Sequence, residues 1–578
     1  MKSATMLARV AVIGLLGALV AACAPAAAPA TTSGEQAPQS SPSSNRTLTV
    51  AIRVEPASTV TRPFRSAGVG LYLPSRMFNA QMAMLDNQGR VVPYLAKSVP
   101  QLNTDSWKIA PDGTMETIYP LQSNVTWHDG APFTAEDFVF GWRVYTAPTM
   151  GNANLAPYNA IQEVVAKDPT TLVVRWKRSY PDTSFATGGL QTEFPPLPRH
   201  ILESAFEPDQ IEAFLNHPFF TREYVGLGPY KLEQWEPGAF IEGVAFPQHL
   251  LGAPKIQRVK LNFIGDARTA LANILSGDVQ LTDGTSVGLP EVGVLKDQQW
   301  MAQGKGGVFS HPNQWRAGFF QYRPDLVTPA ALKNPMVRKA LAYAADRALL
   351  NDSLYFGEGI LSDSPVAPTS IWGPAAIRGA AAYPFDLRQS EQLMQQGGFS
   401  KGPDGVYASP AEGPFSFEVK TNQASDNESE IQVLADGWRR AGFDAHQAVL
   451  PAAQAQDAQA RATFPGMYTN SQNCCESALL GLTKLAIPTA ENRWSGGNRS
   501  GWTNPEYDRL VETFSGTIAQ SDRETQLSQL VKIFTEDVAA ITLFIRPQPW
   551  VYVSEIKGIS LVPPEGNMSW NIYQWELT

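Results

Sequence analysis

Strand and helix patterns alternate along this chain without a fixed period, and this alternation constrains the fold more than any other feature. Residues 47–53 and 171–176 are short runs rich in β-branched side chains, which is typical of buried strands. Residues 333–354 instead carry apolar side chains at helical spacing. The alternation predicts a mixed α/β fold and excludes an architecture of sequence repeats.

The length of the chain, 578 residues, predicts more than one hydrophobic core. Because single cores stop growing at about 250–300 residues, we expect two or three lobes in the folded part, which begins near residue 46. The net charge of −9 and the lack of a basic run argue against nucleic-acid binding.

The first 23 residues have the pattern of a bacterial lipoprotein signal. Lys2 and Arg9 precede an apolar stretch, residues 10–20. That stretch is too short to span ~30 Å of hydrocarbon at ~1.5 Å per helical residue. Small residues before Cys23 would admit a signal peptidase. We therefore expect residues 1–22 to be removed and Cys23 to carry a lipid; an ordinary signal peptide with a chance cysteine is the alternative.

Residues 23–45 are rich in Ala, Pro, Ser, Thr and Gln and contain one charge, Glu35. Such a composition cannot bury enough apolar area to offset the entropy of ordering, so it predicts a disordered tether. No later segment has the length and apolarity of a transmembrane helix. The sequence thus predicts an extracytoplasmic protein, held to the cell membrane only by its lipid, at the cell surface or in a periplasm.

Four segments, in this order along the chain, carry a resemblance to a known family. They are VTWHDGAPFTAEDFVFGW (125–142), GLGPYKLEQWEPG (226–238), NPMVRKALAYAADR (334–347) and GWTNPEYDRLV (501–511). With weaker matches between them, they resemble the bacterial extracellular solute-binding family of ABC importers, which includes oligopeptide-, dipeptide- and nickel-binding proteins. The resemblance covers essentially the whole chain after residue 48.

This resemblance implies a periplasmic-binding-protein-like clamshell of two mixed α/β lobes plus an additional smaller lobe. Lobe I would comprise residues 46–78, 219–310 and 547–578, the extra lobe residues 79–218, and the opposing lobe residues 311–546. It also implies a protein that is not an enzyme, needs no cofactor, captures a peptide or similar small solute by lobe closure, and delivers it to ABC permease subunits.

The first of the four segments also predicts its own local structure. A strand should end in a turn at residues 128–130, where Gly130 permits positive φ and Asp129 bonds nearby backbone. Thr134 and Asp137 form the pattern of a capping box at the start of a helix. Phe138, Trp142 and Tyr145 recur at helical spacing in that helix, which favours core positions over ligand contacts.

The ligand site implied by the resemblance lies in residues 468–480, where peptide-binding relatives hold the ligand's α-ammonium with an Asp. No Asp occurs here, Glu476 is the nearest acid, and Asn79 falls where relatives have a second acid. Because charge-assisted bonds would be lost, we expect a neutral or differently charged ligand, or a peptide held mainly by its backbone. The candidate ligand-binding residues, each of which also has a structural interpretation, are Asn79, Gln321, Tyr322, Arg461, Tyr468, Asn470, Asn473, Cys474, Glu476 and Trp494.

Cys474 and Cys475 form an adjacent pair in the same segment. Outside the cytosol thiols tend to oxidise, so a strained vicinal disulfide is one interpretation and two separate thiols are the other.

Two other functions remain open from the residues. One is a ligand sensor or chaperone-like binding protein that is not tied to an importer. The other is a serine hydrolase, since residues 284–288 read G-x-S-x-G around Ser286, between a short strand pattern and a possible helix. His311 and His446 are the only later histidines for a triad.

The six histidines are widely separated and form no cysteine–histidine cluster, so the sequence predicts no metal site. Transport of a metal chelate stays an alternative, because some members of the resembled family serve nickel uptake.

Overall fold

The computed structural model describes residues 47–60, 71–150, 153, 156–186, 193–208, 210–451, 454, 457–492, 494 and 496–578. The predicted signal peptide, the lipid site Cys23 and the tether lie outside the described residues. Strands and helices alternate throughout the described part, which confirms the mixed α/β prediction. None of the helices in these ranges has both the length and the apolarity to cross a membrane.

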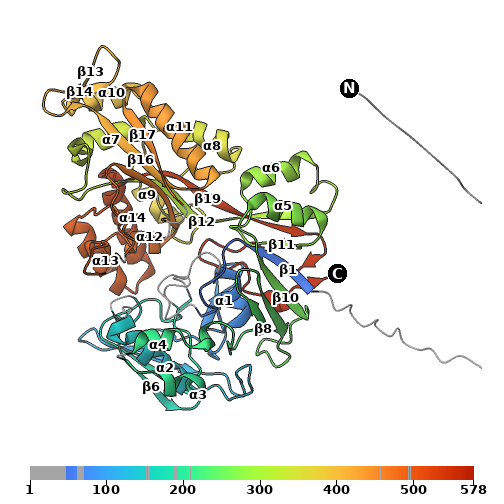
Figure 1. The fold of residues 1–578 in the computed structure, drawn as a ribbon. Helices are drawn as coiled ribbons and strands as arrows, with labels where there is room; N and C mark the ends of the chain where they lie inside the picture. The colour runs from blue at the N-terminus through green and yellow to red at the C-terminus, as the bar shows by residue number, and fades with distance from the viewer. Residues whose placement is uncertain are drawn as a thin grey trace, which may run out of the picture. The chain divides into compact units, whose positions relative to one another are not determined.

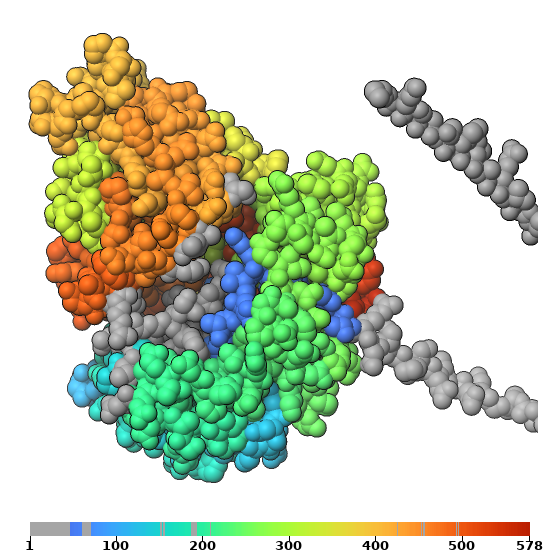
Figure 2. Space-filling view, in the orientation of Figure 1, coloured from blue at the N-terminus to red at the C-terminus, as the bar shows by residue number. Residues whose placement is uncertain are grey.

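The largest sheet contains β1 (Thr47–Ile52), β8 (Tyr230–Glu236), β9 (Phe240–Ala245), β10 (Arg258–Phe263), β11 (Leu281–Thr282), β12 (Gly306–Phe320), β16 (Ser416–Asn422), β17 (Asp444–Leu450), β18 (Met467–Asn473) and β19 (Ala540–Val553). Their order is β17-β16-β18-β12-β19-β11-β1-β10-β9-β8 (Figure 1). The predicted strand at residues 47–53 is confirmed as β1, which pairs in parallel with β10. Figure 2 accordingly shows the blue N-terminal atoms against the green segment that includes β10.

β12 and β19 are the longest strands of this sheet and pair side by side along most of their length (Figure 1). One end of the pair joins β11, through Leu281 opposite Tyr552, and the other end joins β18. The register between them shifts between His311 and Gln314. Residues Ala540–Val553 form one continuous strand, β19. Pro547, which cannot donate a hydrogen bond, falls at the register shift, whereas Pro549 is paired with Ser310.

A second sheet, in the order β4-β5-β7-β6, packs against helix α2. The remaining strands are β2 (Ala83–Leu85), β3 (Val91–Pro93), β4 (Trp107–Ile109), β5 (Met115–Pro120), β6 (Ile161–Asp168), β7 (Thr171–Trp176), β13 (Ser400–Lys401), β14 (Tyr407–Ser409), β15 (Gly413–Pro414), β20 (Ile556–Lys557) and β21 (Glu576–Leu577). β7 confirms the predicted strand at residues 171–176.

The α-helices are α1 (Tyr72–Phe78), α2 (Ala135–Thr146), α3 (Arg199–Leu202), α4 (Ile211–Leu215), α5 (Ala267–Ser276), α6 (Leu289–Asp297), α7 (Pro335–Tyr343), α8 (Arg347–Tyr355), α9 (Gly373–Gly379), α10 (Leu387–Gln396), α11 (Ser425–Ala441), α12 (Glu476–Leu480), α13 (Pro505–Gly516) and α14 (Gln520–Glu536). Residues 333–354 hold two of them, α7 and α8. The break between these helices lies before Asp346, whose side chain accepts a hydrogen bond from Leu349 N–H and caps α8.

The local prediction for residues 121–146 is partly wrong. The turn is present: Gly130 has φ of 91° and Ala131 N–H donates to Asp129 at 3.0 Å. The helix cap is also present, since Asp137 accepts from Thr134 N–H at 2.9 Å. However, no strand precedes the turn. The backbone N–H groups of residues 122, 127 and 128 donate to three different segments, at residues 95, 131 and 226, so no single partner builds a ladder.

The buried apolar side chains form three clusters. The first draws on residues 48–300 and 550–575, and it includes Phe138 and Tyr145 of α2, which confirms their predicted core positions. The second and third draw on residues 289–545 and occupy the part of the protein around α7, α11 and α14. Two regions of the chain therefore bury their apolar faces separately, and β12 and β19 pass between them.

Candidate binding site

β18 and the turn after it carry the centre of the candidate site. β18 pairs antiparallel with β12, so that Tyr468 lies opposite Phe319 and Gln472 opposite Trp315. Because side chains alternate along a strand, Tyr468, Asn470 and Gln472 share one face of β18 and Asn473 belongs to the other.

Four residues are here called the arginine group: Arg461, Tyr468 and Arg499, whose charges interact, and Asn470, which lies on the same face of β18 as Tyr468. Gln472 Nε2 donates to Gly497 O at 3.2 Å, which places the segment before Arg499 against β18. Burial, together with the nearby charge of Arg461, lowers the pKa of Arg499 to about 10. Within the described ranges neither arginine forms an ion pair, and Arg461 Nε and Asn470 Nδ2 are buried without a hydrogen-bond partner. This region holds positive charge that forms no ion pair with an anion among the described residues.

Cys474 and Cys475 form the turn from β18 into α12. Cys474 N–H donates to Asn313 O at 3.0 Å and so extends the pairing with β12 by one residue. Cys475, which precedes α12, has φ of 71° and ψ of −167°. Both cysteines are buried and their thiols are free. The turn delivers Glu476 directly to the first position of α12.

A second set of residues is linked to that position and is here called the Glu476 group: Tyr72, Trp372, Glu476, Arg523 and Glu565. Burial raises the pKa of Glu476 to about 8; the charges of Glu565 and Asp182 add to this shift, and that of Arg523 opposes it. The Arg523 guanidinium lies 5.0 Å from the Trp372 ring centre.

Two links connect the Glu476 group to its surroundings. Tyr72 of α1 donates to Asn473 Oδ1 at 3.4 Å, and the Ser370 hydroxyl donates to Glu565. The second carboxyl oxygens of Glu476 and Glu565 are buried and have no hydrogen-bond partner among the described residues. A carboxyl group that is neutral at pH 7 can donate to a carbonyl or accept from an amide, and once ionised it can hold a cation.

Comparison with known proteins identifies the family. The model of the family described as bacterial extracellular solute-binding proteins, family 5 (middle region), matches residues 97–473, which is more than half of the chain. The chain belongs to this family. The predicted family is thereby confirmed, and the members named below are oligopeptide-binding proteins and a nickel-complex-binding protein.

Two curated relatives are oligopeptide-binding proteins. AppA of Bacillus subtilis (strain 168) is 23% identical over 365 residues, which are 62% of this chain and 63% of AppA. OppA of Haemophilus influenzae is 24% identical over 506 residues, 84% of this chain and 85% of OppA. The alignments with putative peptide-binding proteins of Brucella cover only 51% of those proteins. The chain thus matches about half to two thirds of several relatives.

Solved structures confirm the periplasmic-binding fold. NikZ of Campylobacter jejuni in complex with Ni(L-His) superposes with a TM-score of 0.76 at 20% identity, covering 92% of this chain and 99% of NikZ. An oligopeptide-binding protein of Thermus thermophilus with a bound pentapeptide gives 0.75 at 22% identity, covering 92% and 96%.

The other predicted ligand residues in this family member have protein partners. Asn79 donates to Thr59 O at 2.7 Å and accepts from the Tyr224 hydroxyl. Gln321 donates to Phe464 O at 2.7 Å, and Tyr322 donates to Val538 O at 3.1 Å. The backbone N–H of Trp494 donates to Thr489 O at 2.7 Å. None of these bonds joins the four residues to either group, and their ligand roles stay predictions.

Residues of the Glu476 group other than Glu476 itself escaped the sequence analysis. Tyr72, Trp372, Arg523 and Glu565 come from four distant segments, and no local pattern marks them. The sequence analysis did identify the segment after β18, but it gave no indication that these four residues are linked to that segment in the fold.

The serine motif does not assemble a triad in the described structure. β11 and α6 flank it as a nucleophile elbow requires, but Ser286 is 1% exposed. Its hydroxyl lies 2.9 Å from Ala51 O and 2.7 Å from Asp283 Oδ1. His311 bonds Pro563 O and His446 bonds Asp444, so neither contacts Ser286. Among the described residues, no three His, Cys, Asp or Glu side chains are grouped to hold a metal ion.

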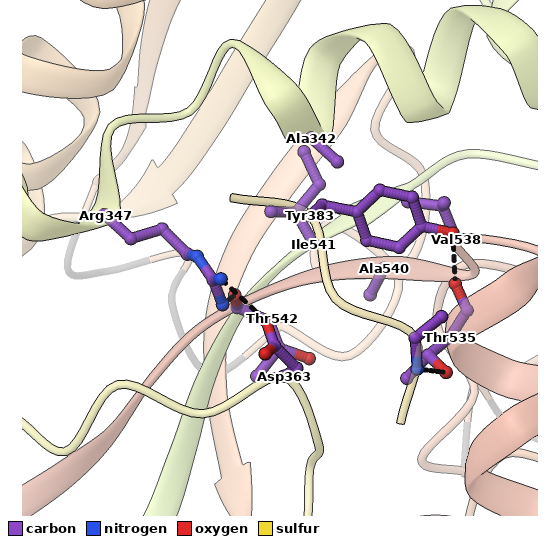
Figure 3. Close-up of a pocket in the computed structure, with 10 residues that line it drawn as sticks. Ala342, Arg347, Asp363, Tyr383, Thr535, Val538, Ala540, Ile541 and Thr542 are labelled. Carbon is purple, nitrogen blue, oxygen red and sulfur yellow. Dashed lines mark hydrogen bonds and ion pairs between the residues drawn. The ribbon is translucent and has the colours of Figure 1, made fainter. Parts of the chain in front are cut away.

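Two hollows lie away from β18. A small hollow of about 20 Å³ is lined by Arg347, Asp363, Tyr383 and Thr535 (Figure 3). It has room for one water molecule, and its polar groups already pair, Arg347 with Asp363 at 2.6 Å and Tyr383 with Thr535 O at 3.0 Å. A surface hollow of about 560 Å³ lies between residues 251–255 and 573–576. Neither hollow contains a predicted ligand residue.

Proposed function

We propose that this protein is the solute-binding component of an ABC importer and captures peptides or similar small solutes at β18. The observation that carries the proposal is that buried polar atoms from distant segments gather near β18 and have no hydrogen-bond partner among the described residues. Buried polar groups are normally hydrogen-bonded, so such atoms are where a polar solute would find its partners. Family membership supports the same function.

The two groups differ in charge, which suggests the chemistry of the solute. The arginine group would accept a carboxylate, since arginines favour charge-assisted bonds with it. The Glu476 group would accept an amide, a neutral donor or an ammonium. A peptide has these features at its two ends. Glu476 is largely neutral at pH 7. We therefore propose that the end of the solute at Glu476 is held by hydrogen bonds between neutral groups, as the sequence analysis expected for a neutral ligand.

We also propose the domain boundaries and the closure that the resemblance implied. The segments 46–78, 219–310 and 547–578 would form lobe I, 79–218 the extra lobe, and 311–546 the opposing lobe. The chain would cross between lobe I and the opposing lobe in β12 and β19, near their register shift. Tyr72 with Asn473 and Ser370 with Glu565 would then be contacts across the cleft. A solute that touches both lobes shifts the protein toward the closed state by its differential affinity.

Anchoring by lipid at Cys23, the tether at residues 23–45 and docking to ABC permease subunits complete the proposal. Mass spectrometry of the protein from native membranes should find a diacylglyceryl group on Cys23. A Cys23→Ser variant should leave the membrane fraction. Recovery of unmodified Cys23 from the membrane would contradict the anchor.

The decisive experiment is native mass spectrometry of the full chain purified from its own host, to find a co-purified solute. Calorimetry should then compare trialanine, N-acetyl-trialanine and trialanine amide. We expect binding of trialanine, a larger loss on amidation than on acetylation, and a smaller radius of gyration in the bound state. If acetylation abolishes binding, the neutral contact at Glu476 is wrong. Binding without any uptake defect in a deletion strain would favour a sensor.

A further inference from the structure

Cys474 and Cys475 place two thiols in contact at the centre of the candidate site. Their Sγ atoms are 2.9 Å apart, and the residues are 2% and 4% exposed. Adjacent side chains in an extended chain point to opposite faces, so this contact requires the backbone to turn. The turn is made by Cys475, whose φ of 71° and ψ of −167° fall in a region that is essentially restricted to glycine and is strained for other residues.

We propose that Cys474 and Cys475 are a reversible thiol–disulfide modification site, and that the vicinal disulfide changes solute binding at β18. Only the effect on binding rests on the proposed function; the modification itself does not. Asn473 and Glu476 flank the pair directly, so a bond between the two sulfurs constrains both neighbours. The disulfide also removes the thiol hydrogen that Cys474 directs at Pro312 O, 3.6 Å away.

The oxidant would be a disulfide, either a small molecule or an oxidoreductase, as expected outside the cytosol. One cysteine thiolate attacks a sulfur of the oxidant R–S–S–R, forms a mixed disulfide and releases the first thiol R–SH. The second cysteine thiolate then attacks the protein sulfur of that mixed disulfide and releases the second R–SH. The two cysteines lose two electrons and two protons in total, and the oxidant gains them.

Access to the pair depends on Tyr72, which lies against it from α1. Tyr72 donates to the neighbouring Asn473, and burial, with smaller contributions from Cys474 and Cys475, raises the pKa of its hydroxyl to about 12. Burial also raises the pKa of Cys475, so the covered thiol stays protonated and reacts slowly. Oxidation is therefore expected when the β18 site is uncovered, and a bound solute should protect the pair.

Peptide mapping of the full chain tests the modification without reference to any solute. The protein is reduced, treated with oxidised glutathione, blocked with N-ethylmaleimide and digested with trypsin. Residues 462–484, which contain both cysteines and no internal Lys or Arg, form one tryptic peptide separate from Cys23. We expect this peptide to be unblocked and lighter by two hydrogen atoms, and doubly blocked after renewed reduction. Two blocked thiols, or a stable glutathione adduct, after the oxidation would overturn the proposal.

Single variants identify the mechanism. In Cys474→Ser and Cys475→Ser, the remaining cysteine should keep its glutathione, because no second thiol displaces it. If either variant fails to fold, the wild-type map alone decides. Resistance of both folded variants to glutathione under conditions that oxidise the wild type would contradict the exchange reaction.

Calorimetry with trialanine tests the effect on binding. We expect the affinities of the oxidised and reduced proteins to differ by at least about fivefold, the lower end of typical coupling between two sites. Equal affinities would overturn the tuning. If trialanine binds neither form, the proposed peptide specificity fails separately. In that case, hydrogen exchange of α12 is compared between the two redox forms. Identical exchange overturns the proposal that the disulfide changes the binding site.

Discussion

Two clusters of charged side chains lie next to β18 and differ in how completely the protein satisfies their hydrogen bonds. Arg316 of β12 donates to both oxygens of Glu430 at 2.8–3.0 Å, and also to Thr421 and Thr469. Arg316 and Glu430 are 3% and 0% exposed. In the Glu476 group, Glu476 is 8% exposed and Glu565 is partly buried, yet two carboxyl oxygens of the group are buried without a partner in the described part of the chain.

The difference separates a group that holds the fold from one that awaits a ligand. Although burial alone lowers it, the charge and hydrogen bonds of Glu430 raise the pKa of Arg316 above its ordinary value. Burial raises the pKa of Glu476 instead, because the nearby charge of Arg523 does not compensate. A protein interior tolerates the first arrangement permanently; the second is more favourable when a solute supplies the missing bonds.

The largest expected effect is on stability, from breaking the satisfied pair. Arg316→Met leaves Glu430 buried without its partner, so the free energy of unfolding should fall by about 3–5 kcal/mol. Chemical denaturation measures this change. The double variant Arg316→Met with Glu430→Leu is the matched control, and it should recover most of the loss. A loss below about 1 kcal/mol, typical of an exposed pair, would contradict the contrast.

The next effect is a pH dependence that belongs to Glu476. Its folded pKa, about 8, lies above the ordinary value of 4.5, so between these values the folded state binds more protons than the unfolded state. The free energy of unfolding should therefore fall as pH rises from 4.5 to 8, by an amount on the order of 3 kcal/mol.

Glu476→Gln should flatten this part of the stability curve, whereas Glu512→Gln, at an exposed position on α13, should leave it unchanged. Denaturation at a series of pH values provides the measurement. Equal slopes in the wild type and in Glu476→Gln would show that Glu476 is not held neutral.

The arginine group should affect binding more than stability. Arg499→Gln and Arg461→Gln each remove a charge that has no protein anion within the described ranges. Affinity for trialanine should fall about tenfold, or about 1.4 kcal/mol, while affinity for trialanine amide should stay nearly constant. Arg509→Gln, at an exposed position on α13, is the control. Equal losses of affinity for trialanine and trialanine amide would show that these arginines do not bind the peptide carboxylate.

The sequence predicted these features unevenly. Local chemistry was accessible: the cap of Thr134 and Asp137, the turn at Gly130 and the apolar face of α7 follow from neighbouring residues. The segment around Cys474 and Glu476 was also found, through its position in the family. The surroundings of Glu476 could not be predicted from the sequence. They depend on where the fold places Arg523 and Glu565, which lie far from Glu476 along the chain. The strand expected before Gly130 was wrong for the same reason: its pattern fits a strand, but its backbone finds no single neighbour.

The smallest expected effect concerns Ser286, which belongs with the satisfied groups. Its hydroxyl is enclosed by Ala51 O and Asp283, so Ser286→Ala should cost about 1 kcal/mol of stability and leave trialanine binding unchanged. Asp283 keeps its bonds from Thr285 in this variant, which limits the loss. A fluorophosphonate probe should not label the wild-type protein at Ser286. Labelling would show that the hydroxyl is reachable and activated. Ser286 would then have a catalytic role instead of a structural one.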